Sequence, residues 1–218
     1  MKQIISLILS VCVCLAAAAA LGESWDAAEA AYAAVLDQYA AGLGGDEAAR
    51  EADESIQTCY MNCQIAGVDP LKGTGYIFQD LDGDGTMELM IGEAGEDTQL
   101  DGCIFAILTL RDGQPVTVHR GWERYRVYPI FDRQAERFGY YAEGSSGAAN
   151  SVFEYAFAGA GMAQWDEAHS LEANGDGDSD VMRWTLDGQE ISEQEADALI
   201  ARWQEARYGL YLTPLSER

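Results

Sequence analysis

The stretch from Tyr76 to Gly92 reads YIFQDLDGDGTMELMIG and indicates the fold class of the chain. Apolar side chains at both of its ends follow the two-residue period that is typical of β-strands. Between them lies a short run of aspartates and glycines, a composition that favours turns. We therefore predict strands over Tyr76–Asp80 and Glu88–Gly92, joined by an acidic loop.

The carboxylates of this loop are spaced as cation ligands. They occupy positions 1, 3, 5 and 9 of the loop, and Gly85 at position 6 permits a sharp turn. Calcium takes six to eight oxygen ligands, and the carbonyl at position 7 can supply one of them. Carboxylates this close repel one another unless a cation neutralises them, and without an ion the loop would be a solvated acidic turn. The predicted calcium ligands are Asp80, Asp82, Asp84, Thr86 and Glu88.

The loop resembles one known calcium motif and departs from another. An EF-hand loop requires a bidentate Glu at position 12, where this chain has Ile91 followed by no helix pattern. The sequence is instead similar to the D-x-D-x-D-G-x-x-[DE]-L loops of FG-GAP repeats in integrin-type β-propellers, where calcium lies between two strands. The resemblance is confined to this loop and occurs once clearly, so it implies a calcium loop and no propeller.

Alternating apolar patterns continue after the loop and imply an antiparallel meander. Further strands are expected over Ile104–Leu110, Val116–His119, Trp122–Tyr128, Phe138–Ala142, Val152–Phe157 and Val181–Leu186. Apolar residues at helical spacing predict helices from Ser24 to Leu43 and from Asp46 to Gln64. A capping box of Ser192 and Glu195 begins a C-terminal helix, for which Gly209 is a candidate cap. The expected class is α+β: two N-terminal helices, an antiparallel β-meander of about six to eight strands, and a C-terminal helix packed on the sheet.

The wider chain is similar to small secreted bacterial proteins, mostly uncharacterised, with one Y-x-x-x-D-x-D-G-D-G-x-x-E-L segment and a closing x-L-D-G-x-x-I-S-x-x-E helix start. The matching segments here are Tyr76–Leu89 and Thr185–Glu195, and Glu143–Gly147 resembles a glycine-rich turn of those proteins. This resemblance implies a shared fold and export from the cell. It implies no activity, because that family has no established one.

The first 22 residues are predicted to form a secretory signal peptide. Lys2 precedes an apolar run over Ile4–Leu21, whose small residues offer a cleavage site. Cleavage would leave residues 23–218 as a single domain, secreted or extracytoplasmic, with no membrane span. The alternatives are an uncleaved membrane anchor, and a lipid anchor on Cys12 or Cys14, although each of these follows a valine that suits a lipobox poorly.

The charge balance excludes two classes of partner. The chain carries 37 acidic and 13 basic side chains, for a formal net charge of −24 at pH 7. Binding to nucleic acid or to anionic lipid needs clustered Lys and Arg. We expect neither partner, and cations are the expected counter-ions.

The cysteines and histidines show no recognisable metal pattern. Cys59, Cys63 and Cys103 follow the predicted signal, and an odd number leaves one thiol unpaired. We expect three small buried side chains, with one bridge to Cys103 as the alternative. His119 and His169 lack zinc-ligand spacing.

Two further segments are candidates for ligand binding. One face of the strand expected over residues 122–128 would carry an aromatic and arginine set that could stack on a sugar or hold an anion. The alternative is an outer face whose arginines pair with acidic helices. The residues of the possible ligand-binding face are Trp122, Arg124, Arg126 and Tyr128.

The second segment is the acidic loop Asn174–Asp180. It lacks glycine at position 6, so a hairpin loop is favoured over a second cation site.

No catalytic residue is predicted. The chain has no G-x-S-x-G nucleophile elbow, and Ser145 lies in a different glycine-rich turn. We therefore expect a secreted, non-catalytic domain with a calcium-stabilised loop that binds an extracellular or envelope ligand. The alternatives are a small extracellular hydrolase, using an acid pair or Ser145, and a structural partner in an envelope assembly.

Overall fold

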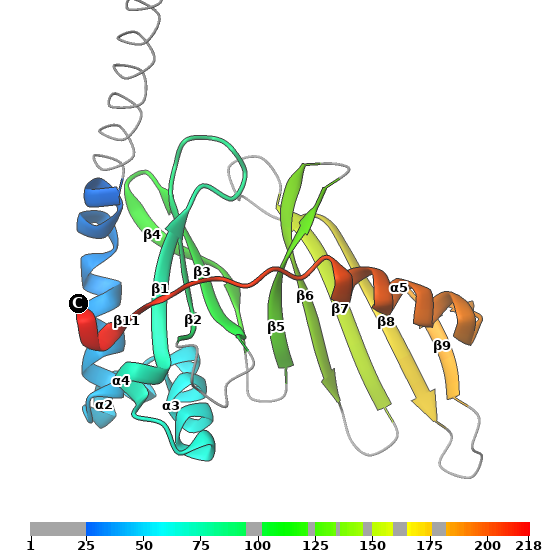
Figure 1. Cartoon of the computed structure of the whole chain (residues 1–218), viewed down its shortest axis with the longest axis horizontal. Coiled ribbons are helices and arrows are strands. Elements are labelled where there is room, and N and C mark those ends of the chain that lie inside the picture. Colours follow the sequence, from blue (N-terminus) through cyan, green and yellow to red (C-terminus); the bar gives the residue numbers. More distant parts are fainter. Residues whose placement is uncertain are drawn as a thin grey trace, which may run out of the picture.

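The computed structural model describes residues 25–94, 102–121, 125–133, 136–145, 150–158, 165–175 and 182–218. The predicted signal peptide over residues 1–22 lies outside this part of the chain. Helices pack beside antiparallel strands, which confirms the predicted α+β class (Figure 1). The described strands form two sheets rather than one, with five and six strands.

The N-terminal part of the described chain is helical. Residues 25–43 form the first predicted helix, which buries Tyr32 completely. The second helix, predicted over Asp46–Gln64, is divided in two because Asp53 takes an extended conformation with a φ of −141°. The Asp53 side chain accepts a hydrogen bond from the backbone N–H of Ser55 and so begins a new helix. The bounds are α2 Glu47–Glu51, α3 Glu54–Ala66 and α4 Pro70–Gly73.

Among the described residues, no helix has both the length and the apolar character needed to cross a membrane.

The first sheet carries the acidic loop. Its order is β11-β1-β2-β3-β4, with every neighbouring pair antiparallel. The two strands predicted on either side of the loop are β1 and β2, which pair from Thr74 opposite Glu93 to Gln79 opposite Glu88. Strand β11 has no sequence signal because it contains only two residues. The bounds are β1 Thr74–Gln79, β2 Glu88–Glu93, β3 Ile104–Arg111, β4 Gln114–Arg120 and β11 Thr213–Pro214.

The second sheet continues the antiparallel meander in the order β10-β9-β8-β7-β6-β5. Strands β8 and β10 were not expected, since β8 is rich in polar residues and β10 is very short. Figure 1 shows this sheet extending away from the helical end of the molecule. The bounds are β5 Tyr125–Asp132, β6 Arg137–Ser145, β7 Asn150–Ala158, β8 Trp165–Gly175, β9 Met182–Leu186 and β10 Gln189–Ile191.

The predicted C-terminal helix is α5 (Glu193–Glu205), which packs on the second sheet (Figure 1). It begins with the predicted capping box, in which Ser192 and Glu195 each accept a hydrogen bond from the other's backbone N–H. The prediction that Gly209 caps its end is wrong. The cap is Ala206, because the next residue, Arg207, already pairs with Ile130 of β5 as an isolated bridge.

One buried cluster joins the helices to both sheets. Tyr32 and Leu36 of the N-terminal helix belong to it, together with Ile91 of β2 in the first sheet. Ile130 of β5 and Tyr141 of β6 belong to the same cluster from the second sheet. Each of these side chains is at most 1% exposed, so the two sheets share an apolar core.

The three described cysteines are buried, unbridged thiols. The expectation of three small buried side chains is confirmed, and a bridge to Cys103 is not formed. Burial raises the pKa of the Cys59 and Cys63 thiols, which keeps both of them protonated and unreactive.

Candidate metal centre

The strand register brings the two ends of the acidic loop together. The β1–β2 ladder ends at the pair of Gln79 and Glu88, so Asp80 directly follows the last paired residue. Gly83 and Gly85 have φ values of 79° and 89°, which side chains other than glycine adopt only with strain. These two left-handed residues let the chain turn tightly enough for its carboxylates to face inward.

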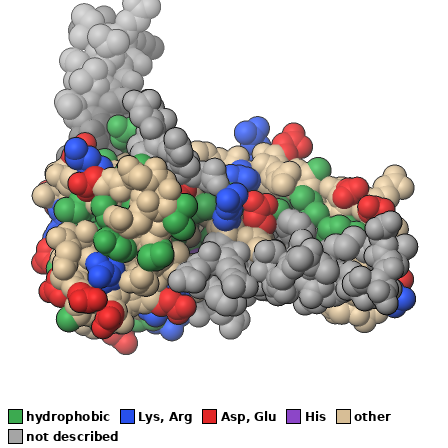
Figure 2. Space-filling model, turned by 90° about the horizontal axis from the view of Figure 1, so that it is seen from below, with side chains coloured by type: hydrophobic (Ala, Val, Ile, Leu, Met, Phe, Trp, Pro, Cys, Tyr) green, Lys and Arg blue, Asp and Glu red, His purple; other side chains and the backbone are tan. Residues whose placement is uncertain are grey.

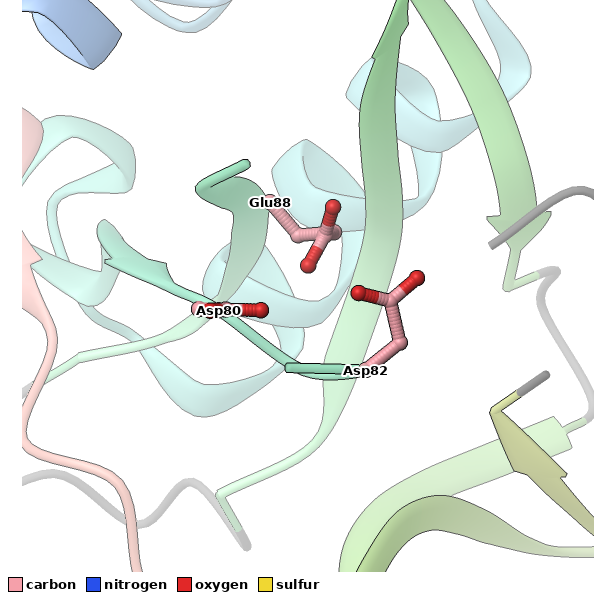
Figure 3. Close-up of side chains that lie close together, drawn as sticks. All are labelled: Asp80, Asp82 and Glu88. Atoms are coloured by element: carbon pink, nitrogen blue, oxygen red, sulfur yellow. The ribbon is translucent and has the colours of Figure 1, made fainter. Parts of the chain in front are cut away.

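Three carboxylates converge within this loop. Asp80, Asp82 and Glu88 each offer an oxygen, and these oxygens all lie within 4.8 Å of one another. Figure 3 shows the three side chains turned toward a common space, with Glu88 reaching it from strand β2. Within the part of the chain that is described, no other set of acidic, histidine or cysteine side chains converges in this way.

Backbone amides hold the two aspartates in place. Asp80 accepts hydrogen bonds from the N–H groups of Gly83 and Gly85, at 2.7 and 3.0 Å. Asp82 Oδ1 accepts one from Asp84 at 3.0 Å. Asp82 Oδ2 is buried and finds no hydrogen-bond partner among the described residues. A buried carboxylate oxygen in that state is costly, and a cation would relieve the cost.

Asp84 takes a different place from the one its spacing suggested. The Asp84 side chain is exposed and accepts a hydrogen bond from the backbone N–H of Thr86 at 2.6 Å. It does not belong to the converging group. Of the four predicted carboxylate ligands, three are therefore brought together and the fourth closes a local turn.

Glu88 is the buried member of the group, with no exposed surface. Its Oε2 accepts a hydrogen bond from the Leu81 backbone at 2.8 Å, and its Oε1 accepts one from the Thr109 hydroxyl at 2.9 Å. Burial, with a smaller contribution from the charges of Asp82 and Asp84, raises the pKa of Glu88 to about 7 against the lowering effect of the two hydrogen bonds. A bound cation would favour the ionised form.

The possible ligand-binding face is only partly described. Trp122 and Arg124 lie outside the described residues. Arg126 is exposed, whereas Tyr128 is 3% exposed and lies beneath the guanidinium of Arg207. Tyr128 is therefore part of the core and is not available on an open surface.

The remaining candidates do not assemble into a described site. The side chains of Ser145 and His169 lie outside the described residues, as do residues 176–180 of the second acidic loop. His119 is partly buried beside the ring of Tyr140, and burial lowers its pKa to about 4. A histidine in that position is neutral and belongs to the packing between the sheets.

Comparison with known proteins adds no relative: no family model, curated protein or solved structure matches the chain.

Proposed function

We propose that the chain is a secreted, non-catalytic binding domain whose β1–β2 loop is held in shape by one calcium ion. The convergence of Asp80, Asp82 and Glu88 carries the proposal. Three carboxylates supply three to six oxygens, and loop carbonyls such as that of Thr86, with water, complete the six to eight that calcium takes.

Two features favour a cation over a merely solvated turn. Among the described residues, the Oδ2 atom of Asp82 is buried without a hydrogen-bond partner, and the buried Glu88 carboxyl beside it accepts hydrogen bonds from neutral donors only. Among the described residues, no Lys or Arg forms an ion pair with either group. A calcium ion would neutralise both carboxylates at once.

The expected affinity agrees with a protein outside the cytoplasm. The loop lacks the bidentate glutamate of high-affinity EF-hands, and extracellular calcium modules bind at about 10⁻⁴ to 10⁻³ M. The signal peptide predicted over residues 1–22 supports the same location.

The test is thermal unfolding of residues 23–218 with calcium and with a chelator. Calcium at about a hundred times its dissociation constant adds about 2.7 kcal/mol to stability, which is roughly 5 to 10 °C in Tm for a chain of this size. We expect Asp82→Asn to abolish this calcium-dependent shift. A wild-type Tm that does not respond to calcium would show the proposal to be wrong.

Two control variants locate the ion. Asp112→Asn removes the same charge from an exposed Asp-Gly turn whose φ of 53° suits asparagine, and should leave the calcium shift intact. Asp84→Asn should retain most of the shift, because the Asp84 side chain closes a local turn and does not belong to the converging group. If Asp84→Asn removes the shift as fully as Asp82→Asn, the ion is bound by the set of ligands predicted from spacing instead.

A further inference from the structure

A cavity of about 670 Å³ lies where the C-terminal end of α5 meets strand β5, at the edge of the second sheet. Residues of β5, β6 and the segment after α5 form its walls, and Gln79 at the end of β1 closes one side. Cavities of this size commonly bind small molecules. The three converging carboxylates do not line it.

Basic side chains gather at this cavity although the chain as a whole is strongly acidic. Arg133, Arg202 and Arg207 line it, against Asp132 and Glu205. Figure 2, a view from below, shows a few basic side chains near the middle of the molecule, with acidic side chains beside them. Arg202 pairs with Asp132 at 3.7 Å, which leaves Arg133 and Arg207 facing one exposed glutamate and the partial negative charge at the end of α5.

Arg207 is held so that its hydrogen-bond donors remain available. Its guanidinium carbon lies 3.2 Å from the centroid of the Tyr128 ring. Stacking occupies the face of a guanidinium and leaves the N–H groups at its edge free to bind a carboxylate or a similar group. Among the described residues, no carboxylate lies within ion-pair distance of Arg207 or of Arg133.

The rest of the wall is aromatic, with Phe131, Phe138, Trp203 and Tyr208 contributing to it. The cavity therefore combines an apolar surface with two arginines that have no carboxylate partner among the described residues.

We propose that this cavity binds an organic anion that carries an apolar ring. Arg207 and Arg133 hold the anionic group, and the aromatic side chains contact the ring. An organic anion of this kind is the ligand class of the proposed binding domain. The inference concerns a different site from the calcium loop and does not depend on calcium binding.

The test is a fluorescence titration with two dyes that differ in charge. 8-Anilinonaphthalene-1-sulfonate carries a sulfonate on fused aromatic rings, and N-phenyl-1-naphthylamine has the same rings without the charge. We expect saturable binding of one sulfonate dye per chain and much weaker binding of the neutral dye. Equal affinity for the two dyes, or no saturable binding, would overturn the proposal.

Three arginine variants locate the bound anion. Arg207→Gln and Arg133→Gln should each weaken binding of the sulfonate dye about ten-fold, the effect of losing a hydrogen bond to a charged group. Arg50→Gln is the matched control, because Arg50 also stacks on a tyrosine, 4.2 Å from the ring of Tyr60, and does not line the cavity. Near-ultraviolet circular dichroism establishes that each variant is folded. Unchanged affinity in both cavity variants would contradict the assignment.

Titrations in calcium and in chelator separate this inference from the calcium proposal. Dye binding that persists in chelator supports the cavity whether or not calcium stabilises the loop. Dye binding that requires calcium but does not respond to either cavity arginine would place the anion elsewhere and overturn the inference.

Discussion

Glu88 shows how a single residue links the loop to the sheet. Its backbone pairs with Gln79 in the β1–β2 ladder, while its side chain reaches the loop at Leu81 and strand β3 at Thr109. Both donors are uncharged, so burial dominates and raises the pKa of the carboxyl to about 7. Without a cation, folding therefore favours protonated Glu88.

We expect Glu88→Gln to remove a pH dependence of stability in chelator. A carboxyl with an ordinary pKa of 4.5 and a folded pKa of about 7 stabilises the fold below pH 4.5, and this contribution is lost as the pH rises to about 7. The loss should be about 2 to 3 kcal/mol in the free energy of unfolding of the wild type relative to the variant. Urea denaturation across this pH range measures it.

With calcium bound, the wild type should no longer lose stability as the pH rises to about 7, because the ion favours the ionised carboxylate. Glu190→Gln, on the exposed strand β10, is the control and should follow the wild type at every pH. Parallel pH profiles for wild type and Glu88→Gln would mean that Glu88 does not titrate in this interval.

The sequence predicts the acidic loop better than the arrangement of its ligands. Alternate carboxylates and two glycines are local signals, so the loop and its flanking strands could be predicted from them. The contact between Thr109 and Glu88 could not be predicted, because it depends on the β2–β3 register, in which Leu89 lies opposite Leu108. The turn made by Asp84 depends on a backbone geometry that spacing alone does not specify.

At the scale of elements, the prediction of one continuous helix over Asp46–Gln64 is wrong. The apolar side chains of residues 46–64 keep their helical period through the break, so periodicity does not indicate that the helix is divided. The missed signal is Asp53, a favoured helix cap in the middle of the run. The strands β8 and β11 were missed for other reasons: polar residues obscure the period of β8, and β11 depends on pairing with β1, which is far away in the sequence.

Asp53 should stabilise α3 more than Asp46 stabilises α2. Asp53 accepts hydrogen bonds from the backbone and hydroxyl of Ser55, and it pairs with Arg120 of β4 at 3.3 Å. We expect Asp53→Ala to lower the free energy of unfolding by about 1 to 2 kcal/mol, chiefly through the lost cap. Urea denaturation is the measurement.

Asp46→Ala is the matched control, because Asp46 caps only the five-residue helix α2, which buries none of its residues. Its effect should be below about 1 kcal/mol. Equal losses in the two variants would mean that the contacts of Asp53 with Ser55 and Arg120 add nothing to the cap.

At the scale of the whole molecule, the shared core argues for a single folding unit. Ile130 lies in the second sheet, yet it belongs to the same buried cluster as Leu36 of the N-terminal helix and Leu89 of the first sheet. Two sheets that met only through polar contacts could unfold separately. Here, loss of packing on one side removes contacts from the other.

Ile130→Ala should therefore destabilise both sheets together. The side chain has no exposed surface, so the substitution should lower the free energy of unfolding by about 2 to 5 kcal/mol. Hydrogen-exchange mass spectrometry can follow peptides from β2 and β6 separately, and protection should fall equally in both. Ile65→Ala removes the same atoms from a side chain that is 80% exposed, and should leave protection unchanged. Faster exchange in β6 with unchanged protection in β2 would show that the sheets unfold independently, and the description of residues 23–218 as one domain would then fail.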